Sequence, residues 1–407
     1  MKRIYWYFYF FLICFPILGQ TDTILVYDVE SKTINEISSK PCDSTLFSEK
    51  TTSSLGEMGN KVNLVLSPPT TNLYSESEFS KIDRVDKFYN ITDYPIRTAI
   101  RLFKYRDDTL SSCCSGILIS PNLVLTAAHC ITENIGFSNS KTWSGGDSIL
   151  AATGYDNGCF NSSLPQSIVS KYYVFKSYYS GVSTINDFAL LELKHPIGLQ
   201  TGWIGIAFNT DTSFYTTNVF HELSYPADAS IVNPSIHVNG DTLYYNYGKI
   251  NLLQPSLIGL NSPEAILIPG QSGSSLFYTD NNDYYSIGIA KYSFHYQHAM
   301  ITRDIFYQFR NIITNYALFD TNAIINKINI KAYPNPFSDF VNIEFDNSKQ
   351  LKYTLTIINS NGQIVCQNSN IISNKIRFFR GNLPSGLYIY NLSASDNIVS
   401  IGKLIIK

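Results

Sequence analysis

Charged residues are scarce in this chain: Asp, Glu, Lys and Arg make up 15% of its 407 residues. The two signs nearly cancel, because 30 basic residues stand against 32 acidic ones, for a formal net charge of −2. A chain without a basic excess lacks the electrostatic means to hold nucleic acid or an anionic membrane surface. Low charge combined with 44% hydrophobic residues also excludes a disordered chain. We therefore expect a folded protein with no nucleic-acid partner, and a monomer.

The short motifs that bind common cofactors are also absent. The sequence has no EF-hand loop, no P-loop and no dinucleotide fingerprint. His221-Glu222 has no second histidine at the spacing of a zinc-binding helix, and His295 and His298 are expected on a surface loop. The sequence therefore predicts no metal and no cofactor.

Only one long hydrophobic run is present, from Ile4 to Leu18, and Lys2 and Arg3 precede it. This pattern predicts a secretory signal peptide over residues 1–20. The alternative is a membrane anchor, but the run is short for a span and no stop-transfer charges follow it. We therefore expect an exported protein in which disulfides persist.

The chain has seven cysteines, and Cys14 lies within the predicted signal peptide. A strand, a turn and a returning strand would bring Cys114 and Cys130 together, closing a loop of 130 − 114 = 16 residues. Such a loop stabilises the fold by roughly 3 kcal/mol in the chain-entropy model. The other four cysteines give a second candidate pair and two candidate free thiols: Cys113 with Cys159, and Cys42 and Cys366.

Residues 21–85 are rich in Ser, Thr, Glu and Lys and are interrupted at Pro68-Pro69. This composition favours a pro-segment or flexible leader. The alternative is a small N-terminal module with strands at residues 24–26 and 62–66.

Two β-rich units follow, as 29 Tyr and 25 Phe suggest. Many short strand signals across residues 86–318 predict an all-β domain, either a sandwich or a pair of barrels. Apolar residues at helical spacing from Ile301 to Ile313 predict a helix that closes this domain. Residues 329–407 alternate apolar and polar, with a hairpin signal at Asn361-Gly362, and predict a small β-sandwich.

Three residues of the middle unit have the side chains of a nucleophilic hydrolase, in the order His129, Asp187, Ser272. His129 ends an apolar strand beside small residues, so its ring can face a cleft. Asp187 precedes a wholly apolar strand, where a carboxylate needs a buried donor, and the Nδ1–H of His129 would supply it. Ser272 lies between glycines, on a turn whose Gly270 and Ser272 N–H groups are the candidate oxyanion hole.

These motifs resemble the chymotrypsin-like serine peptidases, especially their bacterial glutamyl-endopeptidase-like branch. The resemblance covers residues from about 95 to 315 and includes Thr126-Ala-Ala-His129-Cys130, Asp187-Phe-Ala-Leu-Leu and Gly270-Gln-Ser272-Gly-Ser. It implies two β-barrels packed face to face, with the triad in the cleft between them. It also implies a serine endopeptidase that acts on proteins or peptides. The alternative is a catalytically inactive, peptidase-like surface binding protein or adhesin.

Two features depart from the pattern that the resemblance implies, the residue before Ser272 and the S1 pocket. Gln271 replaces the aspartate that pairs with a new N-terminal amine in the animal enzymes, so removal of a leader would relieve steric blockage instead. In the S1 pocket, Leu267 and Ala290 stand where glutamyl endopeptidases have a threonine and a histidine, and Ile266 stands where trypsin has its acid. We therefore expect the peptidase to prefer substrates with an uncharged residue before the cleaved bond. If the Lys291 amine turns into the pocket, it would instead favour an acidic residue there.

The C-terminal unit resembles the sorting domain of type IX secretion substrates. The matching residues are Tyr333-Pro-Asn-Pro-Phe337, Leu383-Pro-Ser-Gly-Leu-Tyr388 and the final Gly402-Lys-Leu-Ile-Ile-Lys407. The resemblance implies that the type IX secretion machinery is a partner, and that the chain crosses the outer membrane to the surface or the exterior. The alternative is a carbohydrate-binding or adhesive sandwich.

Overall fold

The structure is a computed structural model, and its described residues are 22–38, 45–56, 58, 82–107, 109–135, 140–143, 148–227, 239–260, 267–291, 297–315, 330–347, 350, 352–359, 364–394 and 397–407. The predicted signal peptide, residues 1–20, lies outside them. Within these ranges no helix has both the length and the apolar character needed to cross a membrane.

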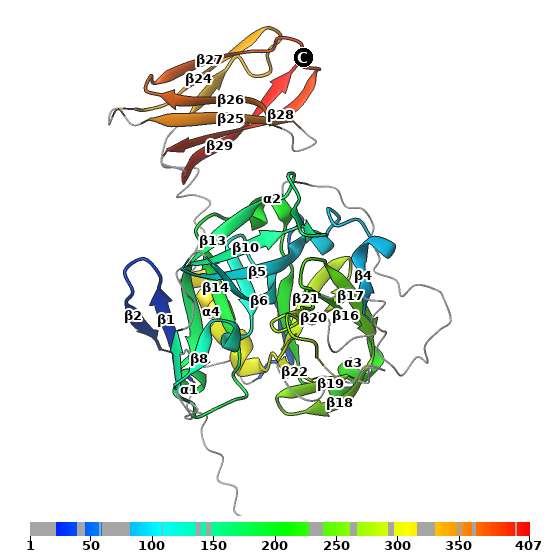
Figure 1. Cartoon of the computed structure of the whole chain (residues 1–407). Coiled ribbons are helices and arrows are strands. Elements are labelled where there is room, and N and C mark those ends of the chain that lie inside the picture. Colours follow the sequence, from blue (N-terminus) through cyan, green and yellow to red (C-terminus); the bar gives the residue numbers. More distant parts are fainter. Residues whose placement is uncertain are drawn as a thin grey trace, which may run out of the picture.

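The first barrel is a closed six-stranded sheet (Figure 1). Its strands pair in the order β10 (Ser148–Thr153), β5 (Ala99–Arg106), β6 (Thr109–Leu118), β7 (Leu123–Thr126), β14 (Ala189–Leu193) and β13 (Gln166–Phe175). The barrel closes where Leu150 of β10 pairs with Ile168 of β13. Both β7 and β14 are almost entirely buried, which explains why they read as continuous apolar runs.

Most of the second barrel follows in the chain, and it has its own sheet, which is antiparallel along its main path. Its order is β18 (Ile250–Gln254), β19 (Leu257–Leu260), β22 (Gln297–Met300), β21 (Asp283–Ala290), β20 (Ser275–Asp280), β16 (Phe220–Ser224), β17 (Tyr244–Gly248) and the edge strand β4 (Asp83–Arg84). One core cluster combines residues of both barrels, among them Leu125 with Phe277 and Ile289. The two barrels are therefore one packed unit, and the all-β, two-barrel prediction is confirmed.

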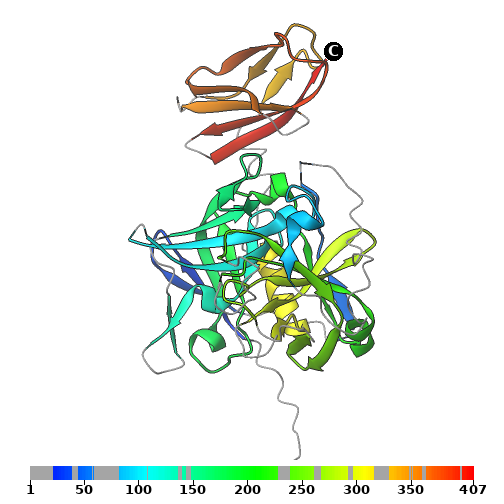
Figure 2. The same ribbon diagram turned by 45° about the vertical axis from the view of Figure 1, so that its right-hand side comes forward.

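The predicted closing helix is also present, as α4 (Arg303–Asn315). Its apolar face is buried through Ile305, Phe306, Phe309 and Ile312. Phe309 contacts the rings of Phe175 and Phe188, which lie next to strands of the first barrel. Phe306 contacts the ring of Phe208, which belongs to a strand that pairs with β21 of the second barrel. The helix thus returns from the end of the second barrel and packs against both barrels, and Figure 2 gives a second view.

The N-terminal residues form strands instead of a flexible leader. β1 (Ile24–Asp28) pairs with β13 and with β2 (Ile34–Ile37), and β3 (Ser48–Lys50) pairs with β15 (Gly205–Asn209). Ile24, Val26 and Ile37 belong to the same core cluster as the barrels. A flexible leader is therefore the wrong description of residues 22–37 and 45–56. Whether this segment is removed during maturation remains a prediction.

The C-terminal unit is the expected small β-sandwich with a core of its own. One sheet holds β23 (Lys331–Tyr333), β24 (Phe340–Glu344) and β27 (Lys375–Phe379), and the other holds β26 (Ile364–Ile371), β25 (Tyr353–Asn359), β28 (Gly386–Ala394) and β29 (Asn397–Ile406). The turn at Asn361-Gly362 lies outside the described residues. The strands on either side of it, β25 and β26, pair antiparallel as the hairpin prediction requires.

Cys114 and Cys130 form a disulfide, which confirms the predicted pair; their Cα atoms lie 6.2 Å apart. The second proposed pair is wrong, because Cys159 is a free, exposed cysteine. Cys159 belongs to β12 (Cys159–Phe160), half of a two-residue ladder at the surface. Cys366 is free, as expected, and Cys42 lies outside the described residues.

Replacing both Cys114 and Cys130 with serine should lower the free energy of unfolding by about 3 kcal/mol, since the unfolded chain regains the freedom of a 16-residue loop. Urea unfolding followed by tryptophan fluorescence measures this change. Cys159→Ser is the matched control and should leave the midpoint unchanged. An equal midpoint for the double variant and the wild type would contradict the prediction.

Candidate active site

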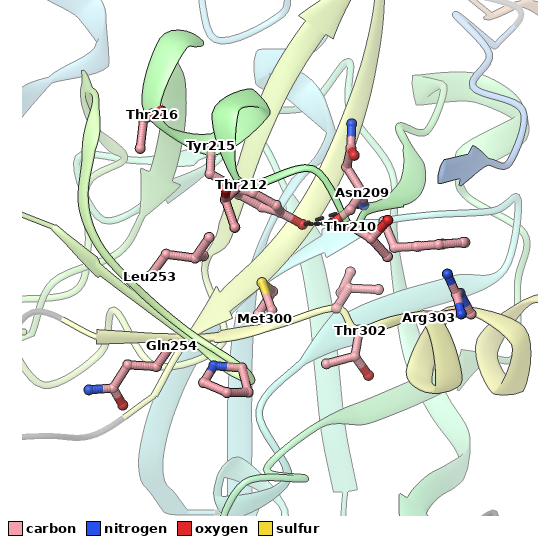
Figure 3. Close-up of a pocket in the computed structure, with 13 residues that line it drawn as sticks. Asn209, Thr210, Thr212, Tyr215, Thr216, Leu253, Gln254, Met300, Thr302 and Arg303 are labelled. Carbon is pink, nitrogen blue, oxygen red and sulfur yellow. Dashed lines mark hydrogen bonds between the residues drawn. The ribbon is translucent and has the colours of Figure 1, made fainter. Parts of the chain in front are cut away.

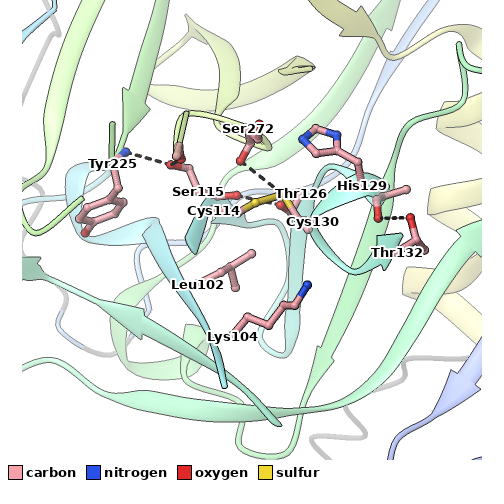
Figure 4. The surroundings of a disulfide bond; sticks show 12 residues. Leu102, Lys104, Cys114, Ser115, Thr126, His129, Cys130, Thr132, Tyr225 and Ser272 are labelled. Atoms are coloured by element: carbon pink, nitrogen blue, oxygen red, sulfur yellow. Dashed lines mark hydrogen bonds between the residues drawn. A yellow bond between two sulfur atoms is a disulfide. The ribbon is translucent and has the colours of Figure 1, made fainter. Parts of the chain in front are cut away.

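His129 lies in a single turn of 3₁₀ helix, Ala128–Cys130, that directly follows β7. Ala127 and Ala128 are completely buried, and the disulfide at Cys130 fixes the other side of the turn. The Thr132 hydroxyl donates to the Ala128 carbonyl at 2.9 Å, which closes the turn (Figure 4). Small buried residues before the histidine and a covalent link after it leave the ring little freedom to move.

Asp187 holds the imidazole through two hydrogen bonds. Its Oδ2 lies 2.8 Å from Nδ1 of His129, and its Oδ1 accepts from the His129 backbone N–H at 2.9 Å. The carboxylate is 7% exposed, so these donors replace the water that burial removes. With Nδ1–H donating to Asp187, Nε2 is the nitrogen with a lone pair, and it has no hydrogen-bond partner among the described residues.

Burial by itself would lower the pKa of His129, but the charge and hydrogen bond of Asp187 outweigh it. The pKa of His129 is therefore raised above its usual 6.5, although Lys141 and Lys291 oppose the shift. Burial also lowers the pKa of Lys291, against the attraction of Asp187. Burial, together with the nearby charge of Asp187, raises the pKa of Tyr178.

Ser272 lies on a tight turn that is bound to the first barrel. Its carbonyl accepts from the Ser115 N–H at 2.9 Å, and Cys130 Sγ lies 3.7 Å from the same oxygen. Gly273 donates to the Ala290 carbonyl at 2.8 Å, which ties the turn to β21. Figure 4 shows the Ser272 and His129 side chains close to the disulfide. No hydrogen bond joins Ser272 Oγ to His129 Nε2 in this structure.

Gly270 requires the absence of a side chain. Its φ is +90°, and a Cβ there would lie 2.4 Å from the Tyr225 carbonyl oxygen and 2.8 Å from the Ala227 nitrogen. Neither the Gly270 nor the Ser272 N–H donates to any acceptor within the described ranges. Two backbone donors on the nucleophile turn are thus available to a ligand, as an oxyanion hole requires.

Sequence reasoning missed a residue that supports this turn. The buried Ser115 hydroxyl donates to the Gly270 carbonyl at 2.7 Å and accepts from the Tyr225 N–H at 2.9 Å. It therefore links the turn to two other segments. Gln271 is completely buried, and its amide bonds to the Ile268 N–H and the Ser224 hydroxyl. The sequence gives no signal for these internal roles, because Ser115 is an ordinary serine in a strand and Gln271 is a neutral residue next to Ser272.

The predicted S1 residues belong to the interior of the second barrel. Leu267 and Ala290 are 5% and 0% exposed and share one apolar cluster, while Lys291 is half-buried. Ile266 lies outside the described residues. A cavity of about 570 Å³ lies elsewhere, between the segments around Tyr215, Leu253 and Met300 (Figure 3). Neither the predicted triad nor any predicted S1 residue lines that cavity.

The expectation for His298 is wrong, because this residue is completely buried and not on a surface loop. It lies on β22 opposite Ala290, and its Nε2 is 3.2 Å from Glu222 Oε1. The same carboxylate oxygen accepts from the Ser274 hydroxyl at 2.5 Å. Alternation along the strand turns His298 into the barrel, where a buried carboxylate makes it tolerable. His295 lies outside the described residues, and those that are described contain no cluster of metal ligands.

Two regions of the chain match models of known families. Residues 92–219 match the trypsin family, and residues 331–407 match the secretion system C-terminal sorting domain. The chain thus carries a trypsin-like serine peptidase domain followed by a sorting domain. The sorting domain indicates type IX secretion to the cell surface or the exterior.

Curated relatives and a solved structure are similar to parts of the chain. The chain is 29% identical over 162 residues to a glutamyl endopeptidase from Bacillus licheniformis, covering 39% of this chain and 46% of that protein. It is 46% identical over 63 residues to an inactive serine protease 35 from Bos taurus, covering 16% and 12%. The chain thus spans less than half the length of these relatives. A solved Glu endopeptidase in complex with MPD has a TM-score of 0.44 at 20% identity, covering 57% of this chain and 95% of that one.

The His129–Asp187 pair predicts a titration that can be measured directly. The ring should titrate above pH 6.5 in the wild type, because Asp187 favours the protonated form. Asp187→Asn removes that charge and leaves burial to dominate, so the ring should stay neutral down to a lower pH. NMR of the histidine side chains across pH, with His129→Gln to assign the signal, gives both values. Asp211→Asn, which alters an exposed helix cap in the second barrel, is the control. Equal titration in the Asp187 variant and the wild type would contradict the pairing.

Proposed function

We propose that this chain is a secreted serine endopeptidase whose triad is His129, Asp187 and Ser272. The observation that carries the proposal is the pair of hydrogen bonds that His129 donates to Asp187, which leaves Nε2 as the base. Figure 4 shows His129 and Ser272 on either side of the same disulfide region. The trypsin-like family match over residues 92–219 supports the same reading.

In the proposed reaction, Ser272 Oγ attacks the carbonyl carbon of a peptide bond while its proton passes to His129 Nε2. The carbonyl oxygen becomes an oxyanion that accepts from the Gly270 and Ser272 N–H groups. The imidazolium, stabilised by Asp187, then protonates the leaving amine, and an acyl-enzyme remains on Ser272. Water attacks this ester with His129 again acting as the base, which releases the acid product and restores the hydroxyl.

Proteins or peptides are the proposed substrates, and the type IX secretion machinery is the proposed partner for export. Leu267 and Ala290, the residues proposed for the S1 wall, both have apolar side chains. A substrate carboxylate there would lose its water without gaining the histidine that a glutamyl pocket supplies. We therefore do not propose the Glu specificity of the similar glutamyl endopeptidase for this chain.

Ser272→Ala should lower the rate of peptide hydrolysis by roughly a million-fold, because no other group supplies the nucleophile. A fluorophosphonate probe should label the wild type and not this variant. Ser31→Ala, on the exposed turn after β1, is the control and should retain labelling and activity. An unlabelled wild type would instead indicate the inactive surface binding protein.

A peptide library should show cleavage mainly after uncharged residues, since the predicted S1 wall is apolar. Sequencing the products gives the residue that precedes each cut. Lys291→Met is the informative variant, because an inward-facing amine would favour acidic residues. Dominant cleavage after Glu or Arg in the wild type would refute the prediction, and loss of a Glu preference in the Lys291 variant would identify the cause.

A further inference from the structure

The first described residue of the chain, Asp22, is bonded to the segment that carries Asp187. Its Oδ1 accepts from the Ser177 backbone N–H at 3.1 Å, and its Oδ2 accepts from the Ser177 hydroxyl. Oδ2 also accepts from the Asn186 amide at 2.9 Å. Asn186 immediately precedes Asp187 and donates to the Ser177 hydroxyl at 3.1 Å as well. Asp22 therefore joins residues that lie 155 and 164 positions away in the sequence.

Asp22 also acts on the other side of Asp187, through the short helix α1 (Lys176–Tyr179). Ser177 is the second residue of this helix, and the buried Tyr178 follows it. The charge of the Asp187 carboxylate acts on the Tyr178 hydroxyl and raises its pKa, so this helix lies near the carboxylate. By fixing Ser177 and Asn186 together, Asp22 constrains both the residue before Asp187 and the helix near its carboxylate.

The strand after Asp22 anchors it to the barrel. β13 pairs with β10 through its first half, while the second half of the same edge pairs with β1, from Ile24↔Phe175 to Asp28↔Lys171. The Lys176 N–H donates to the Thr23 carbonyl at 2.8 Å, which continues this ladder up to α1. Removing β1 would expose an unpaired strand edge and the apolar residues beneath it.

We infer that residues 22–37 are a permanent part of the working peptidase, and that Asp22 is a positioning residue for Asp187. The inference rests on the proposed function for its catalytic consequence. Removal of this segment would break its pairing with β13 and take its buried side chains out of the core. Ile24, Leu25 and Val26 are at most 8% exposed, so this segment is built into the fold.

Asp22→Ala tests the positioning role. It should lower kcat/KM by roughly ten- to hundredfold, mainly through kcat, because small displacements of a catalytic group are costly. The acid limb of the pH profile should also move to lower pH, since a displaced Asp187 raises the pKa of His129 less. The charged groups that face His129 are Asp187, Lys141 on β9 (Lys141–Trp143) and Lys291, and the last two are unchanged in this variant.

Asp28→Asn is the matched control, because it alters a carboxylate of the same hairpin that bonds only to the exposed turn at Ser31. It should keep the wild-type rate and pH profile. If Asp22→Ala does not fold, Asp22→Asn keeps the size of the side chain but turns one acceptor into a donor. In Asp22→Asn the acid limb of the pH profile should also move to lower pH, but by a smaller amount.

NMR titration of His129 gives a readout that does not need peptidase activity. A lower His129 pKa in the Asp22 variants supports the inference even if the wild type hydrolyses nothing, in which case only the proposed function fails. An active wild type with unchanged rate and titration in Asp22→Ala overturns the positioning role. A fully active secreted protein whose mass lacks residues 22–37 overturns their retention.

Discussion

A carboxylate held out of water is the constraint on which the peptidase unit depends. Asp187 lies just before the buried strand β14, where its charge would be costly without strong donors. Both donors come from His129, one from the ring and one from the backbone. The geometry of the turn after β7 is thereby tied to that of the segment before β14. The Ser272 turn then attaches to this frame through Ser115 and the strand that carries Cys114.

Features that depend on local pattern or on short loops were predictable from the sequence. The apolar run of β7 and the acid before β14 predict where the histidine and its partner lie, since adjacent buried strands bring their ends together. Cys114 and Cys130 are only 16 residues apart in the sequence, so a strand, a turn and a returning strand suffice to bring the two thiols together. The helical spacing after Ile301 likewise identifies α4, because its apolar face has a period of 3.6.

Features that depend on distant pairing were not predictable. Composition favours a flexible leader over residues 21–85, and a strand at residues 24–26 is only the alternative. The sheet edge that β1 joins is vacant because β13 is longer than β10, which the sequence does not reveal. His298 reads as a loop residue because nothing near it in the sequence reveals Glu222, 76 positions earlier. Ser115 gives no signal either, since its two hydrogen-bond partners belong to segments more than a hundred residues away. In each case the role of the residue depends on a partner far away in the sequence, which the residue's own neighbours do not reveal.

The C-terminal sandwich and the barrels have separate apolar interiors that share no residue. Proteolysis in the segment that joins them, between α4 and β23, would therefore expose neither interior. The apolar interior of the barrels is thus complete without the C-terminal sandwich, and that of the sandwich is complete without the barrels.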